Sequence, residues 1–114
     1  MSISYVDTGE NLRHIMISGR LDLEGTDSVA ARLLELSAAP KKGVVVDLSA
    51  IKFLASIGIR TLITTAKAVQ QRGGKMVLVV NEQTTVMMSL KATGVDELIP
   101  VYRHITAAEK AAIA

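Results

Sequence analysis

Short apolar runs alternate along the chain with longer stretches of helical periodicity. Residues 44–49 (VVVDLS) form an almost continuous apolar run, as expected of a strand buried on both faces of a sheet. In residues 57–72 the apolar positions recur at helical spacing, and a Gly-Gly pair ends the segment. The pattern predicts strands at about 3–7, 12–18, 44–49, 75–80 and 98–102, and helices from a cap at Asp22 or Thr26 to 37, at 57–72, at 84–92 and from a Thr106 cap onward.

The order of these elements, β-β-α-β-α-β-α-β-α, determines the expected fold class. Strands that alternate with helices imply right-handed crossovers and a parallel sheet. The first two strands are separated only by a Thr-Gly-Glu-Asn turn, so they form a hairpin and make the sheet mixed. We therefore expect an α/β fold with a mixed, mainly parallel sheet of four or five strands and four helices. No linker, repeat or low-complexity segment divides the sequence, so we expect a single domain over residues 1–114.

Composition narrows the range of partners. Hydrophobic residues make up 49% of the chain and charged residues 21%, which is typical of a globular protein. Aromatic residues are only 3%, and a net charge of +2 is too small for an electrostatic footprint on nucleic acid, so no nucleic-acid partner is expected. The absence of Cys excludes disulfides and Cys-based metal sites. No apolar run is long enough to span a membrane and no signal-peptide pattern is present, so we expect a cytoplasmic protein without membrane insertion.

The sequence does not contain the usual motifs of an active site. Neither GxxxxGK[ST] nor GxGxxG occurs, so no phosphate-binding loop is predicted. His14 and His104 have no ligand or nucleophile at motif spacing, and the carboxylates in turns are more typical of helix capping than of acid–base catalysis. We therefore expect no catalytic residue, no metal and no cofactor, and the chain is not predicted to be an enzyme.

Ser56 stands out because it is a single hydroxyl within the apolar stretch FLASIGIRTLI. It precedes a helix of apolar periodicity, so it can act as an N-cap whose loss typically costs about 1 kcal/mol. It also follows the carboxyl end of a buried strand, where the functional groups of α/β sheets gather. A helix start tolerates a phosphate because free N–H groups and the helix dipole favour an anion. Both interpretations, a cap and a phosphorylated switch, remain open from the residues alone.

Three short stretches resemble a known family when they are taken together in this order and spacing. They are SGRLD (18–22), VVVDLSAIKFLAS (44–56) and SIGI (56–59). The sequence resembles the STAS domain, a family named for sulfate transporters and anti-sigma factor antagonists, over nearly its whole length. The resemblance implies the STAS fold and, specifically, similarity to the single-domain anti-sigma factor antagonists, also called anti-anti-sigma factors.

The resemblance also implies a role for Ser56. In the single-domain antagonists the matching serine is phosphorylated by an anti-sigma factor, which is a serine kinase of the histidine-kinase-like ATPase fold. A PP2C-type phosphatase reverses the modification. The unmodified antagonist binds and sequesters the kinase, and phosphorylation releases it, which constitutes partner switching in transcription regulation. Ala55 departs from the family pattern, in which Asp often precedes the serine, and Ile57 replaces a frequent Ser or Thr.

We expect the partner surface to be centred on Ser56, with an exposed apolar rim. The residues assigned to it are Leu54, Ala55, Ser56, Ile57, Gly58 and Arg60, together with Gly19, Asp22 and Glu24 of the preceding strand-to-helix turn. The alternative function is that of a STAS accessory subunit of an ABC-type membrane transport complex. In that case binding is constitutive and Ser56 is only a cap or a contact. A nucleotide-binding or enzymatic domain is a third hypothesis, which the missing phosphate loop disfavours.

Overall fold

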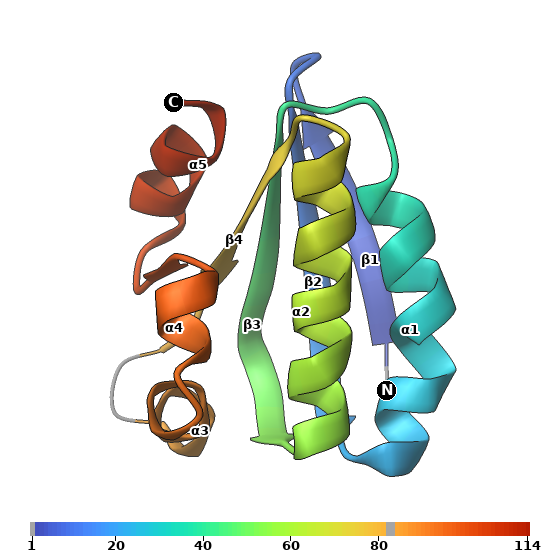
Figure 1. Cartoon of the computed structure of the whole chain (residues 1–114), viewed down its shortest axis with the longest axis vertical. Coiled ribbons are helices and arrows are strands. Elements are labelled where there is room, and N and C mark those ends of the chain that lie inside the picture. The colour runs from blue at the N-terminus through green and yellow to red at the C-terminus, as the bar shows by residue number, and fades with distance from the viewer. Residues whose placement is uncertain (1, 82–83) are drawn as a thin grey trace.

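Five strands form one sheet in the order β1-β2-β3-β4-β5 in the computed structural model, which describes residues 2–81 and 84–114 (Figure 1). The strands are β1 (Ser2–Thr8), β2 (Leu12–Leu21), β3 (Gly43–Leu54), β4 (Lys75–Val79) and β5 (Val101–Tyr102). The helices are α1 (Leu23–Ser37), α2 (Ser56–Gln71), α3 (Thr85–Ala92), α4 (Val95–Leu98) and α5 (Ile105–Ile113). Only β1 and β2 pair antiparallel, so the predicted mixed, mainly parallel sheet is confirmed.

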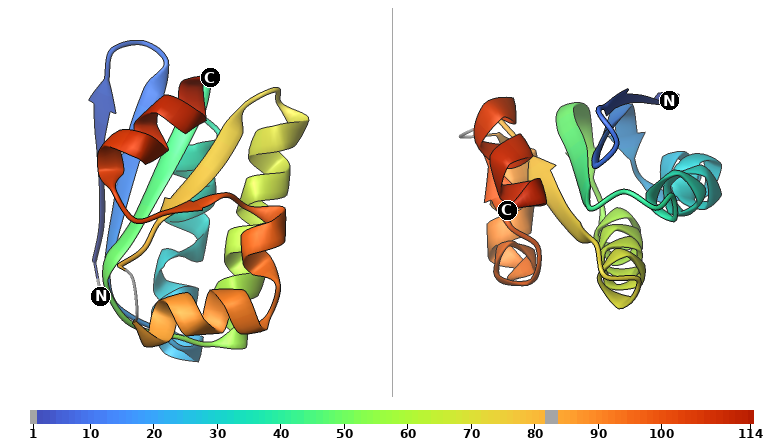
Figure 2. Two further views of the ribbon diagram at one scale, coloured as in Figure 1. Left: turned by 90° about the vertical axis from the view of Figure 1, so that its left-hand side faces the viewer. Right: turned by 90° about the horizontal axis from the view of Figure 1, so that it is seen from above.

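Helices cover the two faces of the sheet unequally. Side chains of α1 to α4 join the larger hydrophobic cluster on one face, whereas α5 alone packs on the other face through Ala108 and Ala112 (Figure 2). Strand β3 contributes to both clusters, because Val44 and Val46 point to the larger one and Val45 to the smaller one. Burial on both faces explains why this strand is a continuous apolar run rather than an alternating one.

The structure corrects the predicted elements at three places. Strand β3 continues five residues beyond the predicted end at Ser49, because it stays paired with β2 through two register shifts near Gly19. Gly94 adopts a left-handed φ of 76° that ends α3 and begins α4, so the described residues hold five helices rather than four. The predicted last strand is therefore shortened to two residues, and α5 begins after His104 instead of at a Thr106 cap.

Two arginines from other elements complete the carboxyl end of α1, whose own last turn has no basic residue. The Arg13 Nη1 atom, on β2, donates to the Leu36 carbonyl at 3.0 Å. Arg72, which follows α2, donates to the Ser37 carbonyl from Nε and Nη2 at 3.1 and 2.9 Å, and to the Lys41 carbonyl from Nη1 at 2.6 Å. Burial lowers the pKa of the Arg72 guanidinium, but it stays charged at neutral pH. The bonds to Leu36 and Ser37 satisfy carbonyls that a helix end leaves without partners, and the bond to Lys41 ties down the loop before β3.

Arg72→Met should lower the free energy of unfolding by about 1–3 kcal/mol, because it leaves partly buried carbonyls without donors. Arg72→Lys should recover only part of the loss, since an ammonium lacks the planar fork that reaches two carbonyls at once. The measurement is urea denaturation followed by circular dichroism. Arg60→Met is the matched control, because Arg60 is exposed on α2. Equal destabilisation by Arg72→Met and the control would contradict this role.

Candidate functional site

Ser56 is the first residue of α2 and its side chain is exposed, so the predicted position at the start of this helix is confirmed. Of the two interpretations that the sequence leaves open for Ser56, the capping role is wrong. The N-cap residue is Ala55, with an extended backbone (φ −87°, ψ 169°), and no side chain caps the helix. Within residues 2–81 and 84–114, no hydrogen bond engages the Ser56 hydroxyl. The hydroxyl is therefore available to another molecule.

The backbone of the neighbouring strands fixes the start of α2. Leu54 is the last residue of β3 to pair with β2, and the Ala55 N–H then donates to the Leu21 carbonyl at 2.9 Å. Gly58 allows the first turn of α2 to lie directly on these strand ends. A Cβ on Gly58 would lie 2.9 Å from both the Leu21 Cβ and the Leu54 Cδ1, closer than real Cβ contacts. The glycine of the SIGI sequence therefore helps to place Ser56, because any side chain at position 58 would push the start of α2 away from the strand ends.

The turn between β2 and α1 lies at the same edge of the sheet. Gly19 adopts a φ of 105°, and the register of the β2–β3 pair shifts beside it. Asp22 is the N-cap of α1, and its Oδ1 accepts a hydrogen bond from the Gly25 N–H at 2.8 Å, so this predicted cap is confirmed. Gly25 is required here because a Cβ would collide with the Arg20 carbonyl oxygen. The Ala55–Leu21 bond brings this turn beside the start of α2, as expected from the sequence.

The apolar rim around Ser56 differs from the prediction. Leu54 is only 4% exposed and belongs to the core, and Gly58 is buried, so both lie beneath the surface. Ile57 is half-buried. The exposed apolar side chains at this edge are instead Leu23, which is 73% exposed, and Phe53, which is 38% exposed. Which residues contact a partner stays a prediction. The accessible apolar surface is formed by Leu23 and Phe53, which adjoin the expected residues Asp22 and Leu54 in the sequence.

Charged groups surround these apolar side chains. The Arg20 guanidinium lies over the Phe53 ring, 4.6 Å from its centroid, and its Nε is 3.5 Å from the Asp22 Oδ2. Lys52 and Arg60 are also exposed. An open hollow of about 630 Å³ lies at the turn, with a lining that includes Arg20, Asp22, Glu24, Ser28 and Lys52. The edge therefore presents both signs of charge next to apolar groups, which suits a protein interface.

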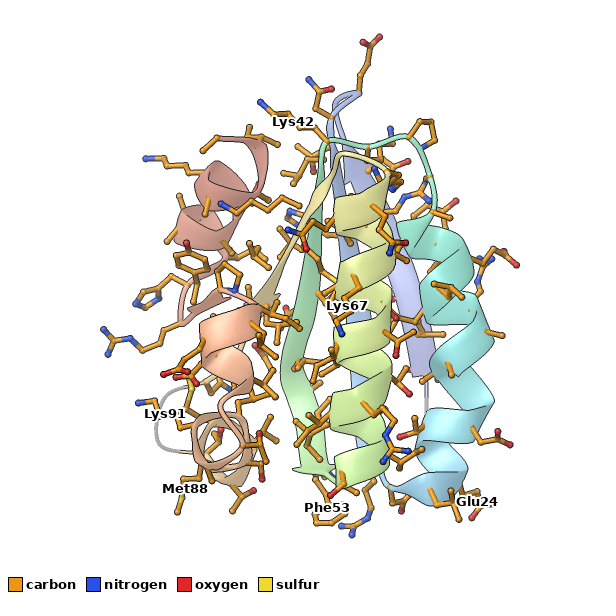
Figure 3. All side chains as sticks on the ribbon, viewed as in Figure 1. Glu24, Lys42, Phe53, Lys67, Met88 and Lys91 are labelled. Carbon is orange, nitrogen blue, oxygen red and sulfur yellow. The ribbon has the colours of Figure 1, made fainter. Side chains whose placement is uncertain are left out.

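Sequence reasoning missed a further exposed apolar residue at this end of the molecule. Figure 3 shows Met88, on α3, at the same lower end as Phe53 and Glu24. Met88 is 65% exposed, whereas its neighbour Met87 is buried. The signal was the helical spacing of Val86 and Leu90, which turns Met88 to the outer side of α3.

The structure does not bring the two histidines together. His14 lies on β2, 3.5 Å from a Glu109 oxygen on α5, and His104 precedes α5 at the surface. In the part of the chain that the structure describes, no group of three or more His, Cys, Asp or Glu side chains is placed to hold a metal ion. No described helix has the length and apolar character needed to cross a membrane.

Solved structures with this fold include anti-sigma factor antagonists of bacteria and a region of an anion transporter. An anti-sigma factor antagonist from Mycobacterium paratuberculosis has a TM-score of 0.88 and 23% identity, covering 99% of this chain and 94% of that chain. The Bacillus cell fate determinant SpoIIAA in its phosphorylated form has a TM-score of 0.68 and 13% identity, covering 96% and 99%. The murine Solute Carrier 26 family member A9 anion transporter has a TM-score of 0.75 and 17% identity, covering 90% of this chain but 18% of that one.

These identities are low, so the structural matches demonstrate a shared fold rather than a shared activity. No curated protein sequence matches the chain at a significant level. A model of the STAS domain family, in contrast, matches residues 5–108. Because this match spans nearly the whole sequence and agrees with the observed fold, the chain belongs to the STAS domain family.

Proposed function

We propose that residues 1–114 act as one STAS domain that switches between partners through phosphorylation of Ser56. The unmodified chain binds and sequesters an anti-sigma factor that is also a serine kinase, and the phosphorylated chain releases it. The observation that carries this proposal is the exposed Ser56 hydroxyl, without a hydrogen bond to any described residue, at the first residue of a helix that lacks a side-chain cap. The fold shared with anti-sigma factor antagonists supports the same class of partner.

The start of α2 suits a phosphate in the free protein. The first hydrogen bond of the helical ladder runs from the Ile59 N–H to the Ala55 carbonyl at 3.1 Å. The N–H groups of Ser56, Ile57 and Gly58 precede it and have no partner within the helix. A phosphoserine adds a charge of about −1.5 to −2, which the helix dipole and these donors favour. Arg60, one turn further along α2, adds a cation.

The same phosphate opposes binding at the proposed interface. Leu23 and Phe53 present exposed apolar surface at this edge of the sheet. In the proposed complex the partner covers the start of α2 together with these side chains, and burying a charge at Ser56 without a partner group is costly. Phosphorylation therefore acts on the complex rather than on the fold. A PP2C-type phosphatase that removes the phosphate would restore binding, and no catalytic group of this chain is needed.

A second candidate function has one observation in its favour. The murine anion transporter contains a region with this fold, which supports a role in membrane transport. The candidate is the accessory subunit of an ABC-type membrane transport complex that the resemblance offers as an alternative. In that function the chain binds constitutively and Ser56 is only a contact. The two candidates differ in their partners and in whether phosphate reaches Ser56. Affinity purification of the tagged chain from its native cell, followed by mass spectrometry, identifies the partner for the experiments below.

The recovered anti-sigma factor, with ATP and Mg²⁺, should transfer one phosphate to the chain, and peptide mass spectrometry should locate it on Ser56. Ser56→Ala should take up no phosphate although it remains folded and bound. Ser49, an exposed serine on β3, supplies the control variant Ser49→Ala, which should be phosphorylated like the wild type. A partner that binds tightly but leaves Ser56 unmodified would favour the transport-subunit function.

Ser56→Asp should weaken binding of the anti-sigma factor by about tenfold or more, because a carboxylate must be desolvated at the interface. Ser56→Ala should bind like the wild type. Since the hydroxyl caps nothing, Ser56→Ala should change the free energy of unfolding by less than about 0.5 kcal/mol. Calorimetric titration and thermal melting separate the two effects. Thr64→Asp, exposed two turns further along α2, is the charge control. Equal affinity of Ser56→Asp and Ser56→Ala would show that Ser56 is no switch.

The presence of Ala55, where the family pattern often has Asp, has a physical effect on the start of α2. Ala55 occupies the N-cap position, where Asp accepts hydrogen bonds from the first turn of a helix. Ala55→Asp should therefore raise the free energy of unfolding by about 0.5–2 kcal/mol, measured by urea denaturation. Ala55→Asn is the uncharged control, and it should stabilise by a similar amount because it caps equally well. Unchanged stability of both variants would mean that these N–H groups already have partners.

A further inference from the structure

A groove of about 420 Å³ runs along α2 on the side that faces α4. Its α2 flank includes Ile63, Ala66 and Lys67, and Met76 of β4 and Leu98 of α4 also line it. Opposite α2, Leu98 to Pro100 at the end of α4 form the other side of the groove, and Gly74 to Met76 line it at the start of β4.

The lining of the groove combines an apolar part with two lysine side chains. Its apolar part includes Met76, which is buried, and Leu98, which is 66% exposed. Lys67 projects from α2 (Figure 3), and Lys75 begins β4 just beyond the end of that helix. Both lysines are exposed, and across residues 2–81 and 84–114 neither forms an ion pair with a carboxylate. Two uncompensated cations thus border an apolar trough, toward the carboxyl end of α2.

We propose that this groove binds a single-chain amphiphile with an anionic head group, such as an acyl carboxylate. The alkyl chain lies along Met76 and Leu98, and the carboxylate lies between Lys67 and Lys75. The volume falls within the range of small-molecule sites, about 300–1,000 Å³. An uncharged apolar ligand would leave both cations uncompensated, and a cationic one would be repelled by them.

The size of the groove favours a small ligand over a peptide helix. Its α2 flank extends from Ile63 to Gln70, which corresponds to about 10 Å along the axis at 1.5 Å per residue. A partner helix of that length has two turns, too few to be stable before binding. The groove also begins about two turns of α2 away from Ser56, so it is separate from the switch proposed above and does not depend on it.

Decanoate is the test ligand, titrated below its micelle concentration into the full chain with labelled Met and Ile methyl groups. Its methyl NMR signals should show saturable shifts at Met76 and Ile63, with little change at Met88, which lies outside the groove. Decyltrimethylammonium has a chain of the same length and the opposite charge, and it should bind about tenfold more weakly or worse. Equal affinity for the two amphiphiles, or no saturable shift at Met76, would overturn the proposal.

Two variants separate the head-group and chain contacts. Lys67→Glu should weaken decanoate binding by about tenfold, whereas Lys91→Glu, an exposed lysine of α3 outside the groove, should leave it unchanged. Ala66→Leu should fill the trough and abolish binding. Circular dichroism establishes that each variant is folded. If the leucine of Ala66→Leu disturbs the core, Lys67→Glu still tests the proposal, because Lys67 is exposed. Undiminished affinity of Lys67→Glu would show that the head group is not recognised here.

Discussion

One backbone hydrogen bond, from the Ala55 N–H to the Leu21 carbonyl, organises the edge of the sheet that carries Ser56. It continues the parallel pairing of β2 and β3 to the point where the chain turns into α2, while β2 turns into α1. Because both helices leave the sheet side by side, their first turns must pass close to backbone. Gly25 and Gly58 are the residues that permit this passage. Strand pairing therefore fixes the position of Ser56, and among the described residues no side chain caps the start of α2.

The alternation of strands and helices, and hence the mixed sheet, was predictable because burial leaves a clear imprint on sequence. Strand β3 is apolar at consecutive positions since both of its faces are covered. Its last five residues gave no such signal, because Ala50, Lys52 and Phe53 are exposed and the strand continues there through pairing with β2. Helix α4 was equally hidden, because it depends on the backbone conformation of Gly94. A hydropathy pattern contains neither the pairing of residues far apart in the sequence nor the backbone dihedral angles of a single glycine.

At the candidate site the sequence placed Ser56 correctly at the start of α2 but expected some buried neighbours to be exposed. Leu54 is a core residue and its neighbour Phe53 faces outward, as the two-residue period of a strand requires once the strand is known to reach this far. Ser56 was a candidate for the cap of α2, and it lies one position too late to fill that role. At the N-cap position a serine hydroxyl would bond to the helix backbone, whereas one residue later it is available to another molecule. Sequence patterns locate helix ends less finely than that.

The two arginines at the carboxyl end of α1 have a consequence for how the molecule opens. Arg13 also holds Asp7 of β1 through its Nε and Nη2 atoms, at 2.7 and 2.9 Å, so one guanidinium joins β1, β2 and α1. Arg72 joins the end of α2 to α1 and to the loop before β3. The last turn of α1 therefore cannot fray without breaking bonds to both of its neighbours. Its amide protons should exchange with solvent together with those at the end of α2, as one cooperative unit rather than as a loose helix terminus.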